Sequence, residues 1–286
     1  MQLVFKHKIL SLSTPAVMGI LNVTPDSFYD GGKFTDERSI LAHTEKMISE
    51  GADIIDIGAC STRPNAPIIT QEEELKRLIP TIKLLRKRYD AVILSADTFR
   101  SNVAMRAIQE GADMINDVSG GSVIASPDAL IGAKQSPRMF EIIGESKVPY
   151  VLMHIQGMPQ TMQKNPEYKN VVGEVMDFFK ERIYALKKAG ASQIIIDPGF
   201  GFGKTLEHNY SLLKNLSIFK ELELPILAGI SRKSMINKAL GTTPETALNG
   251  TTAANMIALM NGANILRVHD VKETKEAVKI FNFTNI

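Results

Sequence analysis

Residues 92–117, VILSADTFRSNVAMRAIQEGADMIND, contain in one stretch the unit from which the fold is built. The apolar run Val92–Asp97 predicts a strand, residues 100–110 predict a helix, and Met114–Asn116 predicts a second strand. Gly111 and Ala112 separate the helix from the second strand, and glycine suits the left-handed position just after a helix. Because the chain must cross back through a helix, the stretch predicts two parallel strands joined as a β-α-β unit.

The same unit recurs along the chain, which has 286 residues. Further strands are predicted at Ala16–Asn22, Asp53–Ile57, Tyr150–His154, Ile194–Asp197, Pro225–Ala228 and Ile265–Arg267. Helices are predicted between and after the strands, at residues 36–50, 70–88, 138–145, 170–189, 206–216, 231–239, 245–261 and 271–281. Gly-Ala pairs also end the helices before residues 53, 192 and 264. Eight alternating strands and helices favour a closed barrel over an open sheet. The expected fold class is α/β, a single (β/α)8 TIM barrel that forms one domain over residues 1–286.

Composition excludes several functional classes. Lys and Arg (33) nearly balance Asp and Glu (31), so the sequence lacks the basic footprint of a nucleic-acid-binding protein. The basic run at residues 86–88 ends a helical pattern and is predicted to be solvated. No apolar run is long enough to cross a membrane, and the N-terminus lacks the apolar core of a signal peptide. Cys60 is the only cysteine, so we expect a cytoplasmic protein. We interpret Cys60 as a small packing residue.

Every predicted strand leads into a polar residue. The strand ends carry Asn22, residues 61–64, Asp97, Asn116 with Asp117, His154, Asp197, residues 231–233, and Arg267 with His269 and Asp270. A helix cap or a loop contact explains any one of them, and this is the favoured reading of Asp117 alone. Polar residues at the ends of all eight strands, gathered at one rim of the barrel, predict a site at the C-terminal ends of the strands. Because buried carboxylates are costly when unpaired, Asp97 and Asp197 are expected to face a ligand or a lysine.

The loops after the seventh and eighth strands are predicted to bind an anion. Residues 231–233 open a predicted helix, and Arg267 and His269 follow the last strand. Cations and a helix N-terminus favour phosphate or diphosphate at this place in a barrel. A structural ion pair between Lys233 and an acidic neighbour is the alternative. The histidine spacing disfavours zinc, whereas Mg²⁺ held by one protein oxygen and a diphosphate suits the sequence.

The glycine-rich run at residues 199–205, GFGFGKT, is not a phosphate-binding loop of a known type. Pro198 occupies the place of the first Walker glycine, and Lys204 that of the third glycine of the dinucleotide fingerprint. We interpret the run as a flexible loop that lets the backbone approach a ligand.

These rim residues lie in motifs that resemble those of the dihydropteroate synthases. The motifs are 19–28 GILNVTPDSF, 56–58 DIG, 61–64 STRP, Asp97, 115–117 IND, 152–154 LMH, 156–157 QG, 159–162 PQTM, 197–204 DPGFGFGK, 231–234 SRKS and 267–270 RVHD. They follow one another in the family's order over nearly the whole chain.

The resemblance implies a reaction and a set of site residues. The family condenses 6-hydroxymethyl-7,8-dihydropterin diphosphate with para-aminobenzoate by a dissociative substitution that releases diphosphate. Carried over by position, the pterin would contact Asp97, Asn116, Val118, Met153, Asp197, Gly229 and Lys233. The diphosphate would contact Asn22, Arg63, Arg267 and His269, with Asn22 as ligand of Mg²⁺. Para-aminobenzoate would contact Phe28, Thr62, Pro64, Phe202 and Ser234. The catalytic residues would be Arg63, Asp97, Lys233 and Arg267. The resemblance also implies a homodimer and binding of sulfonamide inhibitors.

The chain departs from the family pattern near the amine substrate. Ala59-Cys60 stands where the family usually has Gly-Glu, Asn65 stands where it has glycine, and residues 122–137 make a longer stretch than usual. Two other readings therefore stay open. One is a non-catalytic paralogue that binds pterin or a protein partner. The other is a pterin-dependent methyltransferase domain, which needs a corrinoid partner and has no use for diphosphate ligands.

Overall fold

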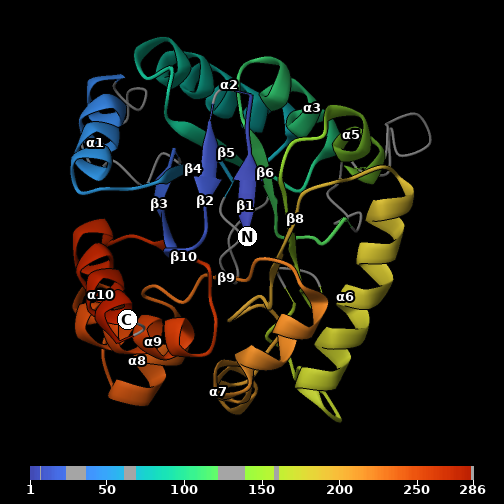
Figure 1. The fold of residues 1–286 in the computed structure, drawn as a ribbon, viewed down its shortest axis with the longest axis vertical. Helices are drawn as coiled ribbons and strands as arrows, with labels where there is room; N and C mark the ends of the chain where they lie inside the picture. Colours follow the sequence, from blue (N-terminus) through green and yellow to red (C-terminus); the bar gives the residue numbers. More distant parts are fainter. Residues whose placement is uncertain (7, 24–36, 61–68, 122–138, 158–160, 285–286) are drawn as a thin grey trace.

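The computed structural model describes residues 1–6, 8–23, 37–60, 69–121, 139–157 and 161–284, which form a barrel of eight parallel strands (Figure 1). The strands are β3 (Ala16–Asn22), β4 (Ile54–Gly58), β5 (Ile93–Asp97), β6 (Met114–Asp117), β7 (Tyr150–Met153), β8 (Ile194–Asp197), β9 (Leu227–Ala228) and β10 (Ile265–Val268). Their order is β8-β7-β6-β5-β4-β3-β10-β9, and a parallel bridge between Ile196 and Ile226 joins β8 to the residues before β9. The predicted fold class is confirmed.

Helices surround the strands, as Figure 1 shows. They are α1 (Glu37–Ser49), α2 (Gln71–Arg88), α3 (Ser101–Gln109), α5 (Met139–Ser146), α6 (Val171–Lys188), α7 (Leu206–Lys214), α8 (Ser234–Leu240), α9 (Leu248–Met260) and α10 (Val271–Phe283), with 3-10 helices η2 (Leu216–Leu222) and η3 (Pro244–Thr246). Within the described ranges, each helix is too short or too polar to span a lipid bilayer. Two predicted helix starts were wrong. Thr243 and Pro244 begin the separate turn η3, and α8 begins at Ser234 instead of Ser231.

The Gly-Ala pairs end four helices in one geometry. The glycines have φ angles of 96°, 110°, 96° and 99° at Gly51, Gly111, Gly190 and Gly262. Each following alanine donates its amide to a carbonyl of the last helical turn, as Ala52 does to Met47 at 2.9 Å. This is the Schellman arrangement, in which the left-handed residue turns the chain back towards the sheet. The sequence prediction for these positions is confirmed.

An N-terminal hairpin, not predicted from the sequence, covers the N-terminal end of the barrel. Strands β1 (Gln2–Val4) and β2 (Ile9–Ser11) pair antiparallel and lie across the barrel in Figure 1. Leu3 and Leu10 are buried in a cluster that contains a residue from every barrel strand: Met18, Ile54, Ile93, Met114, Val151, Ile195, Leu227 and Ile265. Gln193 exchanges two hydrogen bonds with the backbone of Val4, at 2.6 and 2.8 Å. The hairpin therefore closes this end, and the site lies at the opposite end.

Arg86 is not the solvated residue that the sequence predicted. Its guanidinium pairs with Asp113 and donates to the carbonyls of Gly111 (2.9 Å), Asp90 (2.7 Å) and Val92 (3.0 Å). These bonds tie the end of α2 to the chain that leads into β6. Lys87 and Arg88 are exposed, so the prediction holds only for them.

Candidate active site

A cluster of charged and polar side chains lies where β4, β5, β6 and β10 present their C-terminal halves. The Nε of Arg267 lies 2.6 Å from Oδ2 of Asp56, and its Nη2 lies 2.6 Å from Oδ2 of Asp97. Asn116 donates from Nδ2 to the same Asp56 oxygen at 2.9 Å. The parallel register places Asp97 beside Asn116 and Gly58 beside Asp97. The fold thus brings together Asp97, Asn116 and Arg267, as predicted, and adds Asp56.

The environment shifts the pKa of both partners of the Asp97–Arg267 pair. The pKa of Asp97 is raised to about 7, chiefly by burial; Arg267 opposes the rise, and Asp56, Glu74 and Asp117 contribute to it. Burial lowers the pKa of Arg267, but the carboxylates of Asp56 and Asp97 more than reverse that effect. Arg267 is therefore always charged, whereas Asp97 changes charge near neutral pH.

Asp197 and Lys233 face each other on the other side of the barrel mouth. A Cβ placed on Gly229 would lie 3.8 Å from Oδ2 of Asp197 and 3.8 Å from Nζ of Lys233. Asp197 accepts from the amide of Gly199 at 2.7 Å. Lys233 donates to the carbonyl of Phe200 at 2.6 Å and lies 4.7 Å from the ring centre of Phe202. The absent side chain of Gly229 therefore leaves space between an anion and a cation.

Burial also moves these two pKa values towards neutrality. It lowers the pKa of Lys233 to about 8, against the opposing effect of Asp197. It raises the pKa of Asp197, while Lys233, the amide of Gly199 and Arg267 lower it. Buried groups with shifted pKa values at one rim are typical of a binding or catalytic site.

An apolar wall completes this part of the site. Phe99, Val118 and Met153 are buried together, with Cys60 and Phe202 among the residues packed against them. Val118 and Met153 were predicted to contact a pterin. Cys60 is a packing residue, as predicted, and burial raises the pKa of its thiol, so it is not an activated nucleophile. An apolar wall beside a row of donors and acceptors suits a flat heterocycle.

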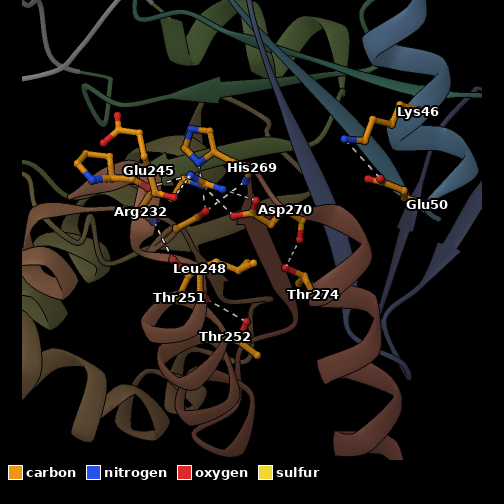
Figure 2. A network of polar contacts seen from close by, with 12 residues as sticks. Lys46, Glu50, Arg232, Glu245, Leu248, Thr251, Thr252, His269, Asp270 and Thr274 are labelled. Atoms are coloured by element: carbon orange, nitrogen blue, oxygen red, sulfur yellow. Dashed lines mark hydrogen bonds and ion pairs between the residues drawn. The ribbon is translucent and has the colours of Figure 1, made fainter. Parts of the chain in front are cut away.

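The loops after β9 and β10 are joined by a polar network (Figure 2). Arg232 forms a two-pronged ion pair with Asp270, at 2.9 and 2.6 Å, and donates to the carbonyl of Pro244 at 2.8 Å. Oγ of Ser231 lies 3.1 Å from Nδ1 of His269. The ion pair with Asp270 thus fixes Arg232 between the two loops, and the hydrogen bond with Ser231 places His269 beside them.

Asp117 is a structural carboxylate, as predicted. It accepts from the amides of Ser119 (2.7 Å) and Gly121 (2.9 Å) and from the hydroxyl of Tyr150 (2.6 Å). These bonds fix the chain just after β6.

The glycine-rich loop differs from its predicted flexibility. Each backbone carbonyl from Gly199 to Gly203 accepts a hydrogen bond from a side chain. The donors are Lys204, Lys233, Gln163 and Tyr168. Five anchored carbonyls in succession make this loop a fixed part of the site.

Several predicted site residues lie outside the described ranges. They are Phe28, Thr62, Arg63 and Pro64, together with the variant position Asn65 and the stretch Ser122–Pro137. Asn22, at the end of β3, is described; its Oδ1 and Oδ2 of Asp97 lie 3.4 and 3.5 Å from a Cβ placed on Gly58. Ser234 is the first residue of α8.

No role was predicted for Asp56 and Lys204, two buried charged residues of this site. Asp56 stands inside a strand that is buried at all five positions, and a carboxylate in such a strand is a usable signal. Lys204 had a signal too, because it follows a glycine-rich run at the rim.

Comparison with known proteins agrees with this geometry. The family model described as "Pterin binding enzyme" matches residues 18–269. The chain is 44% identical over 286 residues to dihydropteroate synthase of Escherichia coli strain K12, with 99% of this chain and 96% of the relative covered. It is 43% identical to the Haemophilus influenzae enzyme of the same name, with 99% of each chain covered.

Solved structures give the same result. A Yersinia pestis dihydropteroate synthase with a sulfonamide drug complex superposes with a TM-score of 0.89 at 42% identity, covering 100% of this chain and 99% of the other. A Xanthomonas albilineans dihydropteroate synthase with 4-aminobenzoic acid has a TM-score of 0.87 at 42% identity, covering 99% and 98%. The similarity therefore spans the whole barrel, including the rim that carries the charged cluster.

Proposed function

The chain belongs to the dihydropteroate synthases, transferases of folate synthesis within the pterin binding enzymes, and we propose that it joins 6-hydroxymethyl-7,8-dihydropterin diphosphate to para-aminobenzoate. One observation carries the proposal. The barrel mouth holds two carboxylates, an amide and an ammonium group beside the apolar wall of Val118 and Met153; these polar residues are Asp97, Asp197, Asn116 and Lys233. One domain over residues 1–286 holds the whole site.

The pterin ring is held by complementary groups. Its ring N–H and amino groups are donors for the carboxylates of Asp97 and Asp197. Its carbonyl and ring nitrogens are acceptors for Asn116 and the ammonium of Lys233. Gly229 lets the ring lie between Asp197 and Lys233, and the side chains of Val118 and Met153 cover one face.

The diphosphate is bound by Asn22, Arg63, Arg267 and His269. Asn22 offers one amide oxygen at the end of β3, and no group of three His, Cys, Asp or Glu side chains in the described residues competes for a metal. This donor set fits Mg²⁺ that keeps several waters and shares the diphosphate with the protein. Mg²⁺ bound to Asn22 would neutralise charge that develops on the leaving group.

The reaction is a dissociative substitution at the pterin methylene carbon. The C–O bond breaks with its electron pair leaving on the diphosphate, and a cation forms at the methylene. The carboxylate of Asp97 stabilises that cation, and Arg267 stabilises the departing anion. The lone pair of the para-aminobenzoate nitrogen then forms the C–N bond, and the proton that the nitrogen loses goes to the released diphosphate. No side-chain nucleophile takes part.

Para-aminobenzoate binds next to Phe202, in the loop after β8, and Ser234, at the start of α8. Phe28, Thr62 and Pro64 complete this subsite. Sulfonamides bind in the same place, in keeping with the sulfonamide complex of the Yersinia pestis relative.

The protein works in the cytoplasm as a homodimer. The exposed apolar side chains of Ile257, Met260, Ile280 and Phe283 on the adjacent helices α9 and α10 support the dimer.

The test is diphosphate release by the purified protein, given the pterin diphosphate and Mg²⁺, with and without para-aminobenzoate. We expect release that depends on para-aminobenzoate and falls at least about 100-fold in Lys233→Ala, because the ring loses a charged hydrogen-bond partner. The exposed α8 lysine variant Lys238→Ala is the control and should keep wild-type rates.

Two results would contradict the proposal. Pterin binding without diphosphate release would indicate the non-catalytic paralogue. Methyl transfer to a corrinoid partner without diphosphate release would indicate the methyltransferase domain.

A further inference from the structure

Lys204 is a buried lysine held by uncharged acceptors, and burial lowers the pKa of its ammonium group to about 7. The residue is 2% exposed, and its Nζ lies 2.9 Å from Nδ1 of His154, 3.0 Å from the carbonyl of Gly199 and 3.0 Å from that of Phe202. No carboxylate of the described residues lies within ion-pair distance of it. An ammonium has three N–H donors, and the acceptors around this one, which also include the carbonyl of His154 at 3.4 Å, come from two different strand ends.

His154 is suited to its part in this cradle. Burial and, to a smaller extent, the charge of Lys204 together lower its pKa to about 2, so the ring is neutral. The neutral ring accepts at Nδ1 from Lys204. Lys204 therefore joins the end of β7, where His154 stands, to the loop after β8.

The backbone of that loop lies directly against the end of β7. A Cβ on Gly199 would stand 1.9 Å from the carbonyl oxygen of His154, and one on Gly203 would stand 2.2 Å from that of Gln156. Both glycines have positive φ angles, 69° and 63°. The close approach turns the carbonyls of Gly199 and Phe202 towards Lys204.

The same loop fixes two residues of the proposed reaction. The carbonyl of Phe200, between the two carbonyls that Lys204 holds, accepts from Lys233 at 2.6 Å. The ring of Phe202 lies 4.7 Å from the Lys233 ammonium. A shift of this loop therefore moves a predicted pterin ligand and a predicted para-aminobenzoate contact together.

We propose that Lys204 is a positioning residue for the transfer reaction: its buried ammonium holds the Gly199–Gly203 loop against β7 and so places Lys233 and Phe202. The proposal rests on the synthase function proposed above. Lys204 touches neither substrate in this arrangement and acts through the carbonyls that it holds.

The first test compares Lys204→Met with Lys214→Met, a matched control at an exposed position of α7. Methionine fills the same channel but cannot donate, so the loop loses its anchor. We expect KM for both substrates to rise about tenfold, because misplacing contacts costs binding in the ground state as well as the transition state. Lys214→Met should match the wild type. A Lys204→Met variant that unfolds more easily, yet keeps both KM values within about twofold, would show a purely structural lysine and overturn the proposal.

The second test is chemical rescue of Lys204→Ala. Propylammonium replaces the atoms that this substitution removes, so it should raise the thermal midpoint of the variant and lower both KM values towards the wild type. Tetramethylammonium at equal ionic strength has no N–H donor and should do neither. Rescue by both ions, or by neither, would contradict the proposal.

A third measurement separates this proposal from the synthase function. Calorimetry with 6-hydroxymethylpterin reports the placement of Lys233 without any turnover. A wild-type protein without diphosphate release would refute the synthase function. The positioning role would still be supported if Lys204→Met bound the pterin more weakly than the wild type. It would be supported further if propylammonium restored pterin binding in Lys204→Ala. Equal pterin affinity in wild type and Lys204→Met would overturn it.

Discussion

Asp97 serves two partners in the proposed reaction. In the structure its Oδ2 lies 2.6 Å from Arg267, while the pterin requires the same carboxylate as an acceptor. Arg267 also bonds to Asp56 at 2.6 Å, so it stays anchored when Asp97 turns to a ligand. Asp56 therefore keeps the arginine in the site, ready for an anion.

The shifted pKa values predict a narrow pH optimum. Asp97 must be ionised to stabilise a cation, so kcat/KM should fall as the pH drops below about 7. Lys233 must be protonated to donate, so kcat/KM should fall again above about 8. The measurement is the pH profile of kcat/KM for the pterin diphosphate. The control is Lys233→Arg, whose side chain stays charged and should lose the alkaline limb. An alkaline limb that persists in Lys233→Arg would assign it to another group, either the substrate or Lys204, whose pKa burial lowers to about 7.

The raised pKa of Asp97 also makes the free energy of unfolding depend on pH. The folded protein holds this proton more tightly than the unfolded chain, whose value is near 3.8. The contribution of Asp97 to the free energy of unfolding is therefore full below pH 3.8 and is lost as the pH rises to about 7. Activity and this part of stability change in opposite directions with pH.

The site residues that end strands were predicted from the sequence. Residues whose role depends on contacts that long side chains make with distant parts of the chain were not. Asp97, Asn116 and Asp197 follow apolar runs, and the barrel fold places such residues at one rim. Asp56 and Arg86 gave no such positional signal. Their roles depend on partners far along the chain, such as Arg267 for Asp56, and only the three-dimensional structure shows those partners.

At the scale of elements, the packing of α5 against the end of α6 requires a glycine. A Cβ on Gly144, within α5, would lie 1.8 Å from the carbonyl oxygen of Ala189. Backbone cannot move away as a side-chain tip can. The two helices therefore approach closely only because residue 144 has no side chain.

Gly144→Ala should lower the free energy of unfolding by about 3 kcal/mol, because helix α5 must shift to admit the methyl group. Urea unfolding followed by circular dichroism measures it. Gly250→Ala in α9 is the comparison, since its Cβ would meet side-chain atoms, Cγ2 of Ile236 at 2.5 Å and Cδ1 of Leu240 at 2.6 Å, instead of backbone. Its effect should stay within about 1 kcal/mol. Equal losses in the two variants would show that the close approach at Gly144 has no special cost.

Elements were predictable from sequence where they are long or repeated. All eight barrel strands and the four Gly-Ala helix ends were found, because parallel strands are continuous apolar runs. The hairpin β1–β2 was missed because each strand has three residues, with one buried residue between two exposed ones. Runs of three residues are too short to show a periodic pattern. The residues against which Leu3 and Leu10 pack lie in the eight barrel strands, far along the chain.

At the scale of the molecule, helices α9 and α10 present the surface proposed for the dimer. Met260 is 61% exposed and Phe283 is 76% exposed. Met260→Lys with Phe283→Lys should convert a dimer to a monomer in light scattering after size exclusion, because buried unpaired charges oppose association. The control is Tyr184→Lys on α6, which is equally exposed at 72% and lies elsewhere on the barrel (Figure 1). A double variant that stays dimeric would place the interface on another surface.

The hairpin at the closed end has a consequence for the order of assembly. Residues 2–12 are synthesised before every barrel strand, yet Leu3 and Leu10 are buried against residues as distant as Leu227 and Ile265. Contacts of such high sequence separation form late, because closing the long loops between them costs entropy. The hairpin thus leaves the ribosome before the barrel strands yet is among the last elements to dock, and until the final strand arrives its apolar side chains remain available to a chaperone.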